Sequence, residues 1–245
     1  MRKGQGLVEN DRQRATAEKQ YNNAIRQVLT QQPPTAMEIL RHLTNEKVQL
    51  LNPELRQFYE NYIVVSSEQA LTISIANESQ RSDAWLRQRS MRITASNARS
   101  QYTYNANPNA NWDTRFQELY HSTLKGNEDT TRRLCCKGPA RDVYEENTNT
   151  KVYELSLVIR EELPWLSASL DGVVVDDQGR LVRTLEIKTV TGQYLTAEEL
   201  VANNCINGKL KTENGMDENG KLKTKTDHYG QVQIGMLLSG LPECD

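Results

Sequence analysis

The chain has 245 residues and a mass of 28.0 kDa, enough for one large domain or for a core domain with a helical extension. Hydrophobic residues make up 37% and charged residues 25%, which is typical of a globular chain, and 30 Lys and Arg nearly balance 32 Asp and Glu, for a formal charge of −2. No run approaches the roughly 18 apolar residues of a membrane span, and no apolar segment follows the polar N-terminus, so we expect a non-secreted, intracellular protein of nucleus or cytoplasm, without a membrane partner.

The cysteines predict neither a disulfide framework nor a zinc site. The four of them form no C-x-x-C pair and have no histidine at finger spacing, so a reducing compartment is the default expectation. The balanced charge lacks the basic excess of most nucleic-acid-binding domains, so binding to DNA would need positive charge gathered on one surface. Five arginines between residues 81 and 99 indicate either such a surface or an ordinary solvated helix face.

Residues 1–80 are predicted to be helical, and nothing in them suggests chemistry. Thr35 is predicted to cap one of these helices, with Glu38 completing a capping box. The expected helices are 14–31, 36–49, 53–62 and 66–77. We interpret residues 1–80 as a helical N-terminal extension that serves as a cap or an interaction subdomain.

Residues 81–245 show helices alternating with strand-like runs, which predicts an α/β domain. Helices are expected at 82–89, 114–124, 139–147 and 228–238, and strands at 152–160, 167–175 and 181–190. The hexapeptide Asn-Gly-Lys-Leu-Lys-Thr occurs twice, at 207–212 and 219–224, which predicts a hairpin or loop arm because two repeats are too few for a solenoid. The chain ends without an evident closing element, so we expect a domain truncated at its C-terminus.

The last two strand-like runs predict a hairpin that places two carboxylates opposite each other. With Gln178-Gly179 as a two-residue turn, Asp171 lies directly across from Glu186 on the same face of the sheet. Because side chains alternate along a strand, Ser169 and Lys188 share that face. The alternate residues are expected to point towards a core: Leu170, Leu185 and Ile187.

Two opposed carboxylates repel each other unless a cation lies between them. Carboxylate oxygens and a backbone carbonyl suit Mg²⁺ or Mn²⁺, which also retain waters and substrate phosphate oxygens. Lys188 would face the same water and stabilise the negative charge that develops while a phosphodiester is hydrolysed. The alternative interpretation of this Glu-x-Lys is an exposed, salt-bridged strand face without chemistry.

Four motifs follow one another over residues 82–240. They are W-x-x-x-R with I-T-A-S at 85–96, P-W-x-x-x-S-x-D-G at 164–172, L-E-I-K at 185–188 and Y-x-Q-x-Q at 229–233. In this order they resemble the PD-(D/E)XK nucleases, and within them the YqaJ-type viral recombinase family that includes phage lambda-type exonucleases. The resemblance covers about two thirds of the chain and says little about residues 1–65.

The resemblance implies a fold, an activity and partners. The fold is a three-layer α/β/α restriction-endonuclease-like domain with a central mixed sheet, preceded here by the N-terminal helical segment. The activity is Mg²⁺-dependent hydrolysis of DNA, with Mn²⁺ as a substitute, and most closely a 5′→3′ exonuclease on linear duplex DNA in recombination or repair. The implied partners are DNA, further copies of the chain in a homo-oligomer, and a single-strand annealing or recombination protein.

The resemblance also assigns roles to individual residues. The metal ligands are Asp171, Glu186 and the carbonyl of Ile187, and Lys188 is the catalytic lysine. Gln231 is expected to reach the catalytic site, whereas Gln233, two residues on, points elsewhere on a helix. The pocket for a DNA 5′-phosphate is formed by Arg89, Ser96 and Ser169, which suits the planar, bidentate donors of arginine. Trp85 is expected to serve as the core anchor of its helix.

One position departs from the family pattern. A helix before the Asp strand usually carries G-x-x-x-E-x-x-A-x-x-x-Y, and the frame set by Ala140 and Tyr144 places Lys137 where the glutamate belongs. Asp142 or Glu145 would substitute only if the helix shifted. The departure implies reduced or lost activity. The competing hypothesis is therefore a catalytically degenerate nuclease fold that acts as a DNA-end-binding module.

Overall fold

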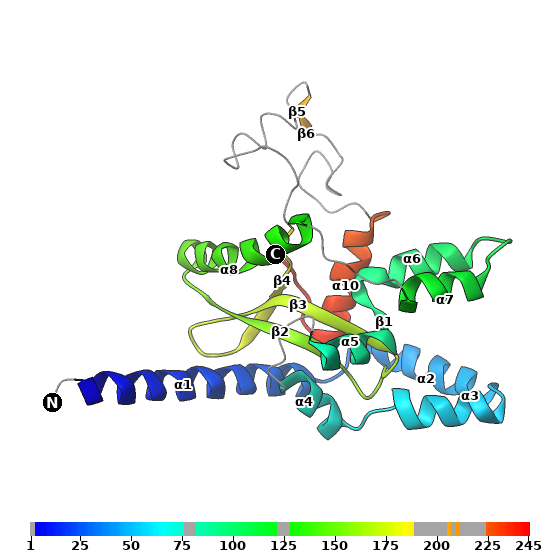
Figure 1. Cartoon of the computed structure of the whole chain (residues 1–245), viewed down its shortest axis with the longest axis horizontal. Coiled ribbons are helices and arrows are strands. Elements are labelled where there is room, and N and C mark those ends of the chain that lie inside the picture. Colours follow the sequence, from blue (N-terminus) through cyan, green and yellow to red (C-terminus); the bar gives the residue numbers. More distant parts are fainter. Residues whose placement is uncertain (1–2, 76–81, 122–127, 189–204, 207–208, 211–223) are drawn as a thin grey trace.

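The computed structural model of the chain describes residues 3–75, 82–121, 128–188, 205–206, 209–210 and 224–245 (Figure 1). At its centre is a four-stranded mixed sheet. The long strand β3 (Leu166–Val175) pairs along one edge with antiparallel β2 (Lys151–Ile159). Along its other edge β3 pairs first with the short parallel strand β1 (Ile93–Thr94) and then with antiparallel β4 (Leu181–Leu185).

Strands β1 and β4 leave an opening along the edge of β3 that they share. β1 pairs with β3 at Leu166 and Ser167, whereas β4 pairs with it from Gly172 onward. Residues 168–171 of β3 therefore lie between the two pairings on this edge. Side chains from both ends of the opening can meet there, and this is where most of the predicted site residues lie.

The last residues of the chain lie along the outer edge of β4. The amide of Thr184 donates to the carbonyl of Glu243, and the amide of Asp245 donates to the carbonyl of Thr184, each at 3.0 Å. The amide of Glu186 donates to the carbonyl of Asp245 at the same distance. These bonds surround a parallel bridge between Thr184 and Cys244 and hold the backbone of Glu186 in place. The sequence did not predict this pairing.

The turn between β3 and β4 differs from the predicted two-residue turn. The amide of Asp176 donates to the carbonyl of Arg180 at 2.9 Å, so the loop contains three residues, and Gly179 has a left-handed φ of 75°. Oδ1 of Asp176 accepts the amides of Gln178 and Arg180, both at 2.9 Å. An aspartate that binds nearby amides in this way stabilises the longer turn, and this is why the two-residue prediction is wrong.

The register predicted for the hairpin is nevertheless correct near the site. A bulge after Val174 offsets the extra turn residue. Gly172 consequently pairs with Leu185, next to the predicted pair of Asp171 and Glu186. Two errors of one residue, in opposite directions, cancel before the strands reach the carboxylates.

Helices account for most of the remaining described residues. In chain order the elements are α1 (Lys3–Thr30), α2 (Thr35–Gln49), α3 (Pro53–Phe58), a π-helical segment (Tyr59–Ile63), α4 (Ser67–Ile75), α5 (Asp83–Ser90), α6 (Ala95–Asn105), α7 (Trp112–His121), α8 (Glu128–Thr148), the short strands β5 (Cys205–Ile206) and β6 (Lys209–Leu210), and α10 (Asp227–Ser239). Helix α6 was not predicted. Thr35 is the first residue of α2 and not its cap, because Pro34 occupies that position.

Parts of some predicted elements lie outside the described residues. They are 76–77, 122–124, 189–190 and most of the repeat segment, at 207–208 and 211–223. β6, which lies in the predicted arm, forms a small antiparallel pair with β5, which lies just before the arm.

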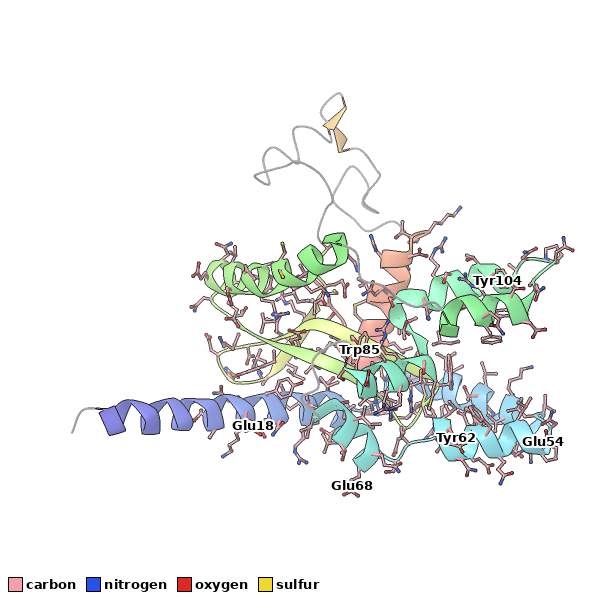
Figure 2. All side chains as sticks on the ribbon, viewed as in Figure 1. Glu18, Glu54, Tyr62, Glu68, Trp85 and Tyr104 are labelled. Carbon is pink, nitrogen blue, oxygen red and sulfur yellow. The ribbon has the colours of Figure 1, made fainter. Side chains whose placement is uncertain are left out.

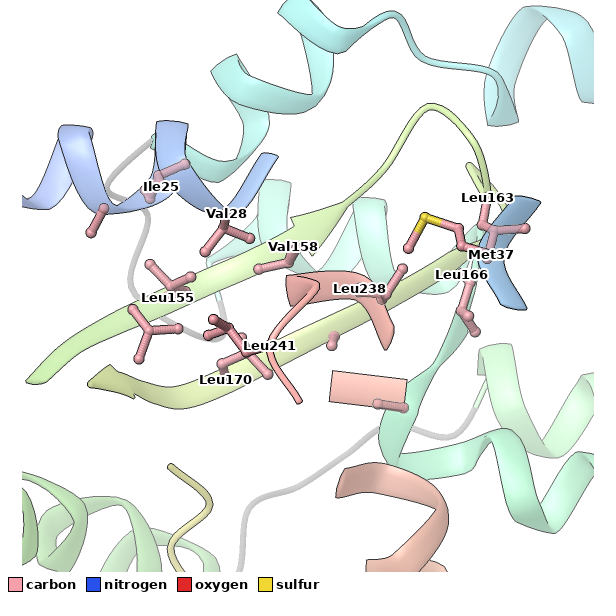
Figure 3. Close-up of a cluster of buried hydrophobic side chains, with 14 residues drawn as sticks. Ile25, Val28, Met37, Leu155, Val158, Leu163, Leu166, Leu170, Leu238 and Leu241 are labelled. Atoms are coloured by element: carbon pink, nitrogen blue, oxygen red, sulfur yellow. The ribbon is translucent and has the colours of Figure 1, made fainter. Parts of the chain in front are cut away.

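Helices pack on both faces of the sheet, as the predicted α/β fold requires. On one face, α1 and α10 join β2 and β3 in the main core, where Val28, Leu155, Leu170 and Leu238 are all buried (Figure 3). On the other face, Tyr144 of α8 packs against a second cluster. The sequence therefore predicted the layers correctly, with burial of apolar faces between sheet and helices as their cause.

The prediction of one shared core face for three residues of the hairpin is wrong in part. Leu170 belongs to the main core. Leu185 is buried in the second cluster with Val152 and Val174, and Ile187 packs against that cluster. The cause is an irregularity of β3 between Leu170 and Gly172, described below.

The N-terminal helices share the main core with the sheet. Ala24, Ile25 and Val28 of α1 are buried in it. The buried guanidinium of Arg160, at the end of β2, donates to the carbonyls of Val28 at 3.0 Å and Gln31 at 2.9 Å. The domain boundary near residue 81 stays a prediction. Among the described helices, none combines the length and apolarity needed to cross a bilayer.

Candidate functional site

A β-bulge lies at the centre of the opening. β2 and β3 pair up to Leu170 and again from Val173, but between these points Asp171 and Gly172 together oppose the single residue Glu154. A bulge of this kind bends its strand and redirects the side chains next to it. It explains why Leu170 and Val173, three residues apart, both reach the main core. It also turns Asp171 away from that core.

Gly172 makes the bulge sterically possible. A Cβ at this position would lie 2.3 Å from Cγ1 of Val152 and 3.3 Å from Cβ of Leu185. No ordinary side chain fits against β2 and β4 at these distances. The glycine after Asp171 is therefore required by close packing of the strands.

Asp171 is buried, with 3% of its side chain exposed. Its Oδ2 accepts the amide of Ile187 at 3.0 Å, which links β3 to the end of β4. Its Oδ1 accepts a hydrogen bond from the ammonium of Lys137 on α8. A buried carboxylate costs several kcal/mol unless it is paired and hydrogen-bonded, so these two partners compensate the charge of Asp171.

Glu186 is the second carboxylate of the site and is held from two sides. Its Oε1 accepts from Nζ of Lys188 at 2.5 Å and from Nε2 of Gln231 at 2.7 Å. Nζ of Lys188 also donates to Oε1 of Gln231 at 2.8 Å. Burial, and then repulsion from Asp171, raise the pKa of Glu186, while the charge of Lys188 opposes the rise. We call Asp171, Glu186, Lys137 and Lys188 the carboxylate cluster.

Arg141 fixes helix α8 against the bulge. Its Nη1 donates to the carbonyl of Asp171 at 3.2 Å, and its Nη2 forms an ion pair with Oε2 of Glu154 at 2.6 Å. Arg141 thus contacts both strands at the bulge: the carbonyl of Asp171 on β3 and the side chain of Glu154 on β2. Lys137 lies one helical turn earlier on the same face of α8, which directs it to the neighbouring carboxylate.

A second group of predicted residues meets at the other end of the opening. Nη2 of Arg89 on α5 lies 3.3 Å from Oγ of Ser96, and Nη1 lies 3.5 Å from Oγ of Ser169, both long for hydrogen bonds. Ser96 lies in the first turn of α6, and the N-terminal end of a helix favours an anion. We call Arg89, Ser96 and Ser169 the hydroxyl pocket. It adjoins the carboxylate cluster because Ser169 precedes Asp171 by two residues on β3.

The guanidinium of Arg89 is partly buried, and burial lowers its pKa. Its hydrogen-bond partners are hydroxyls, and no carboxylate in the described part of the chain forms an ion pair with it. It lies over the ring of Trp85, 4.3 Å from the ring centroid. Figure 2 shows Trp85 on α5, beside the strands, and its ring packs against a buried cluster there as a core anchor does. A cation in this state attracts a phosphate or another anion.

The five clustered arginines do not form one basic surface. Arg92 is buried and donates to the carbonyl of Pro164 at 2.8 Å, and burial lowers its pKa to about 10. Arg99 forms an ion pair with Asp227 at 3.5 Å, and Arg87 is exposed. Arg81 lies outside the described residues, so among the other four only Arg89 lies in the pocket.

The structure brings the predicted site residues together in two adjoining groups. Gln231 reaches Glu186 and Lys188, whereas Gln233 is exposed, as their spacing on a helix requires. Ile187 contacts Asp171 through its amide. Sequence reasoning missed Arg141 altogether and treated Lys137 only as a departure. The predicted helix, 139–147, excluded Lys137, so the four-residue spacing that places both side chains on one face of α8 could not be used.

The carboxylate oxygens of the cluster are the kind of ligand that a hard divalent cation prefers, with one exception. No group of three or more His, Cys, Asp or Glu side chains converges in the part of the chain that the structure describes. Mg²⁺ needs only one or two carboxylates, however, because it retains water and binds substrate phosphate, and Asp171 and Glu186 supply two. The exception is Oδ1 of Asp171, which the ammonium of Lys137 already contacts.

Residues 84–241, which contain every residue of both groups, match the family model of the YqaJ-like viral recombinase domain. The match covers more than half of the chain, so the chain belongs to this family, which is part of the PD-(D/E)XK nuclease superfamily. The mixed α/β architecture agrees with the restriction-endonuclease-like fold of that superfamily. Membership indicates a nuclease or recombination function with DNA as the substrate. No curated protein sequence matches the chain.

Proposed function

We propose that this chain is a Mg²⁺-dependent deoxyribonuclease that degrades linear duplex DNA in the 5′→3′ direction during recombination or repair. One observation carries the proposal: a carboxylate pair with an adjacent lysine adjoins, along one strand edge, a guanidinium that pairs with no carboxylate among the described residues. A phosphate held by the guanidinium would place the neighbouring phosphodiester next to the carboxylates.

The hydroxyl pocket would bind the 5′-phosphate of a DNA end. Arg89 supplies two parallel donors, and the hydroxyls of Ser96 and Ser169 supply further hydrogen bonds to the remaining oxygens. The long contacts within the pocket would be exchanged for shorter, charge-assisted ones. Binding the terminal phosphate in this way would set the polarity of digestion, because the DNA strand is then held at its 5′ end.

The carboxylate cluster would carry out the hydrolysis. Asp171, Glu186 and the carbonyl of Ile187 would hold Mg²⁺, which supplies Lewis acidity and a more acidic water when bound. Lys188 contacts both Glu186 and Gln231, so its ammonium is oriented by two acceptors. In that position it can stabilise negative charge on the phosphate or move a proton at its Nζ atom. Gln231 positions both partners through its amide group.

The test is digestion of a 5′-phosphorylated linear duplex in the presence of Mg²⁺. We expect wild type to release nucleotides and Lys188→Ala to be slower by at least about a hundredfold. Lys151→Ala is the matched control, because Lys151 is an exposed lysine that pairs with Glu145 at 2.8 Å. Degradation at equal rates by wild type and Lys188→Ala, or by neither, would refute the proposal.

A second candidate function is a DNA-end-binding module that does not cleave. The contact of Lys137 with Asp171 favours it, since an ammonium then occupies an oxygen that a nuclease would offer to its metal. Such a module would bind 5′-phosphorylated ends through Arg89 and leave them intact with Mg²⁺ or Mn²⁺. A gel-shift assay run beside the digestion assay separates the two candidates.

A further inference from the structure

Two ammonium groups neutralise the two buried carboxylates of the site. Lys188 contacts Glu186 and Lys137 contacts Asp171, so two positive and two negative groups cancel. The exposed fractions of the carboxylate side chains are only 3% for Asp171 and 10% for Glu186. Opposed carboxylates this well buried require nearby positive charge. Here the chain supplies that charge from its own side chains.

The position of Lys137 is fixed by the packing of α8. One turn further along the helix, Arg141 contacts the carbonyl of Asp171 and the carboxylate of Glu154. Tyr144 then packs against the second cluster beneath it. With the next two turns anchored, the side chain of Lys137 points at Asp171, and only 23% of it remains exposed. The contact is therefore part of how the helix packs and not a chance approach of a surface lysine.

We infer that Lys137 is an internal counter-cation that competes with a divalent metal for Asp171, so that this chain binds Mg²⁺ and Mn²⁺ more weakly than the same chain without that ammonium. A metal ion that bound Oδ1 would meet a positive charge at hydrogen-bonding distance from the same oxygen. Lys137 must therefore move away from Asp171 before the metal can bind. This leaves the ammonium without its carboxylate partner, and the cost lowers the affinity for the metal. The inference rests on the proposed function only in taking Asp171 and Glu186 as the metal ligands.

Calorimetric titration with Mn²⁺ and then Mg²⁺, without DNA, tests the inference on the full chain. We expect Lys137→Gln to lower the Kd for Mn²⁺ at least about tenfold relative to wild type. Lys137→Glu adds a third carboxylate and should bind the metal most tightly. Lys137→Arg retains the cation and should bind like wild type. Lys151→Gln removes a lysine from the exposed ion pair with Glu145 and serves as the matched control.

Thermal unfolding with and without Mn²⁺ gives a second readout for a variant that folds poorly. Metal should raise the Tm of Lys137→Gln and Lys137→Glu by more than that of wild type, because only ligand binding to the folded state stabilises it. Affinities within twofold for wild type and Lys137→Gln would overturn the inference. Absence of metal binding in every variant would overturn it too, since freeing Asp171 should create a measurable site.

The two proposals fail in different ways. If Lys137→Gln gains metal affinity but no variant cleaves DNA, the counter-cation is supported and the nuclease proposal falls. If wild type cleaves DNA and binds Mn²⁺ as tightly as Lys137→Gln, the nuclease proposal stands and the counter-cation is refuted.

Discussion

In the carboxylate cluster every buried charge has an opposite partner, whereas in the hydroxyl pocket the guanidinium of Arg89 has hydroxyls and an aromatic ring beside it. The two groups adjoin on β3, where Ser169 and Asp171 are two residues apart. They nevertheless differ in how much must change before each group can bind a ligand. A phosphate bound in the pocket would supply the counter-charge of Arg89. The cluster would have to give up the ion pair between Lys137 and Asp171 before a metal could bind.

Under the proposed function, this difference would separate recognition of a DNA end from cleavage. Binding of a phosphate should be insensitive to divalent metal, because Arg89 needs no ion to present its donors. Cleavage should depend on how easily Lys137 leaves Asp171. Substitutions in the hydroxyl pocket and in the carboxylate cluster probe the two groups separately.

Arg89→Ala should have the largest effect. It removes the charged donors of the hydroxyl pocket, and hydrogen bonds to charged groups contribute about 1.5–3 kcal/mol. We expect the preference for 5′-phosphorylated over 5′-hydroxyl ends to fall about ten- to a hundredfold, measured by equilibrium binding to both duplexes. Metal affinity should not change. Arg87→Ala, on the same helix but exposed, is the matched control, and an equal loss in both variants would show that the effect is general electrostatics.

Arg89→Lys would sharpen this result. Lysine keeps the positive charge but loses the planar pair of donors. An intermediate preference for the phosphorylated end would show that fork geometry contributes beyond charge. A preference equal to that of wild type would show that charge alone suffices.

Gly172→Ala should destabilise the fold by about 1–3 kcal/mol, because the added Cβ overlaps Val152 and the bulge must shift. Chemical unfolding measures the loss. Gly138 is the matched control, since a Cβ there meets nothing within 4 Å and alanine suits its helix. The shift should disturb Asp171 and spare the hydroxyl pocket, so selectivity for 5′-phosphate should persist. Equal stability of both variants would mean that the strands accommodate the methyl group freely.

The sequence predicted β2, β3, the start of β4 and the layers because alternating hydrophobicity and helix signals are local. It did not predict β1, and β4 ends at Leu185, before the predicted end at 190. It also predicted the proximity of Asp171 and Glu186, although this depended on two compensating irregularities in the hairpin. The bulge that redirects Asp171 was not predictable, since it follows from pairing with β2, which is distant in sequence. Only the glycine at 172 hinted at it.

Lys137 shows a different limit of sequence reasoning. The sequence showed only that an acidic residue is missing at this position. The structure shows that the ammonium of Lys137 contacts the carboxylate of Asp171. Whether the side chain at such a position points into the site or away from it depends on how the helix packs. That packing is set by Arg141 and Tyr144, whose partners lie on other strands.

The pH dependence of stability should show the smallest effect, and it reports on the cluster alone. Burial and the neighbouring Asp171 raise the pKa of Glu186 above its ordinary value. The folded chain therefore keeps a proton on Glu186 at pH values where the unfolded chain has lost it. The contribution of Glu186 to stability is therefore greatest below the ordinary glutamate pKa and falls as pH rises through the higher folded pKa, by at most about 1.4 kcal/mol per pH unit for one proton.

Glu186→Gln cannot lose that proton, so its stability should fall less over the same pH range, as measured by chemical unfolding in a chelating buffer. The comparison isolates one residue, because all other carboxylates titrate in both proteins. Parallel curves would mean that Lys188 and Lys137 together offset the burial of Glu186. In the single variant Lys137→Gln, stability should fall more steeply with pH than in wild type, because the substitution removes a cation that lowers the pKa of Glu186. The steeper fall would tie the charge balance of the cluster to the same ammonium that opposes the metal.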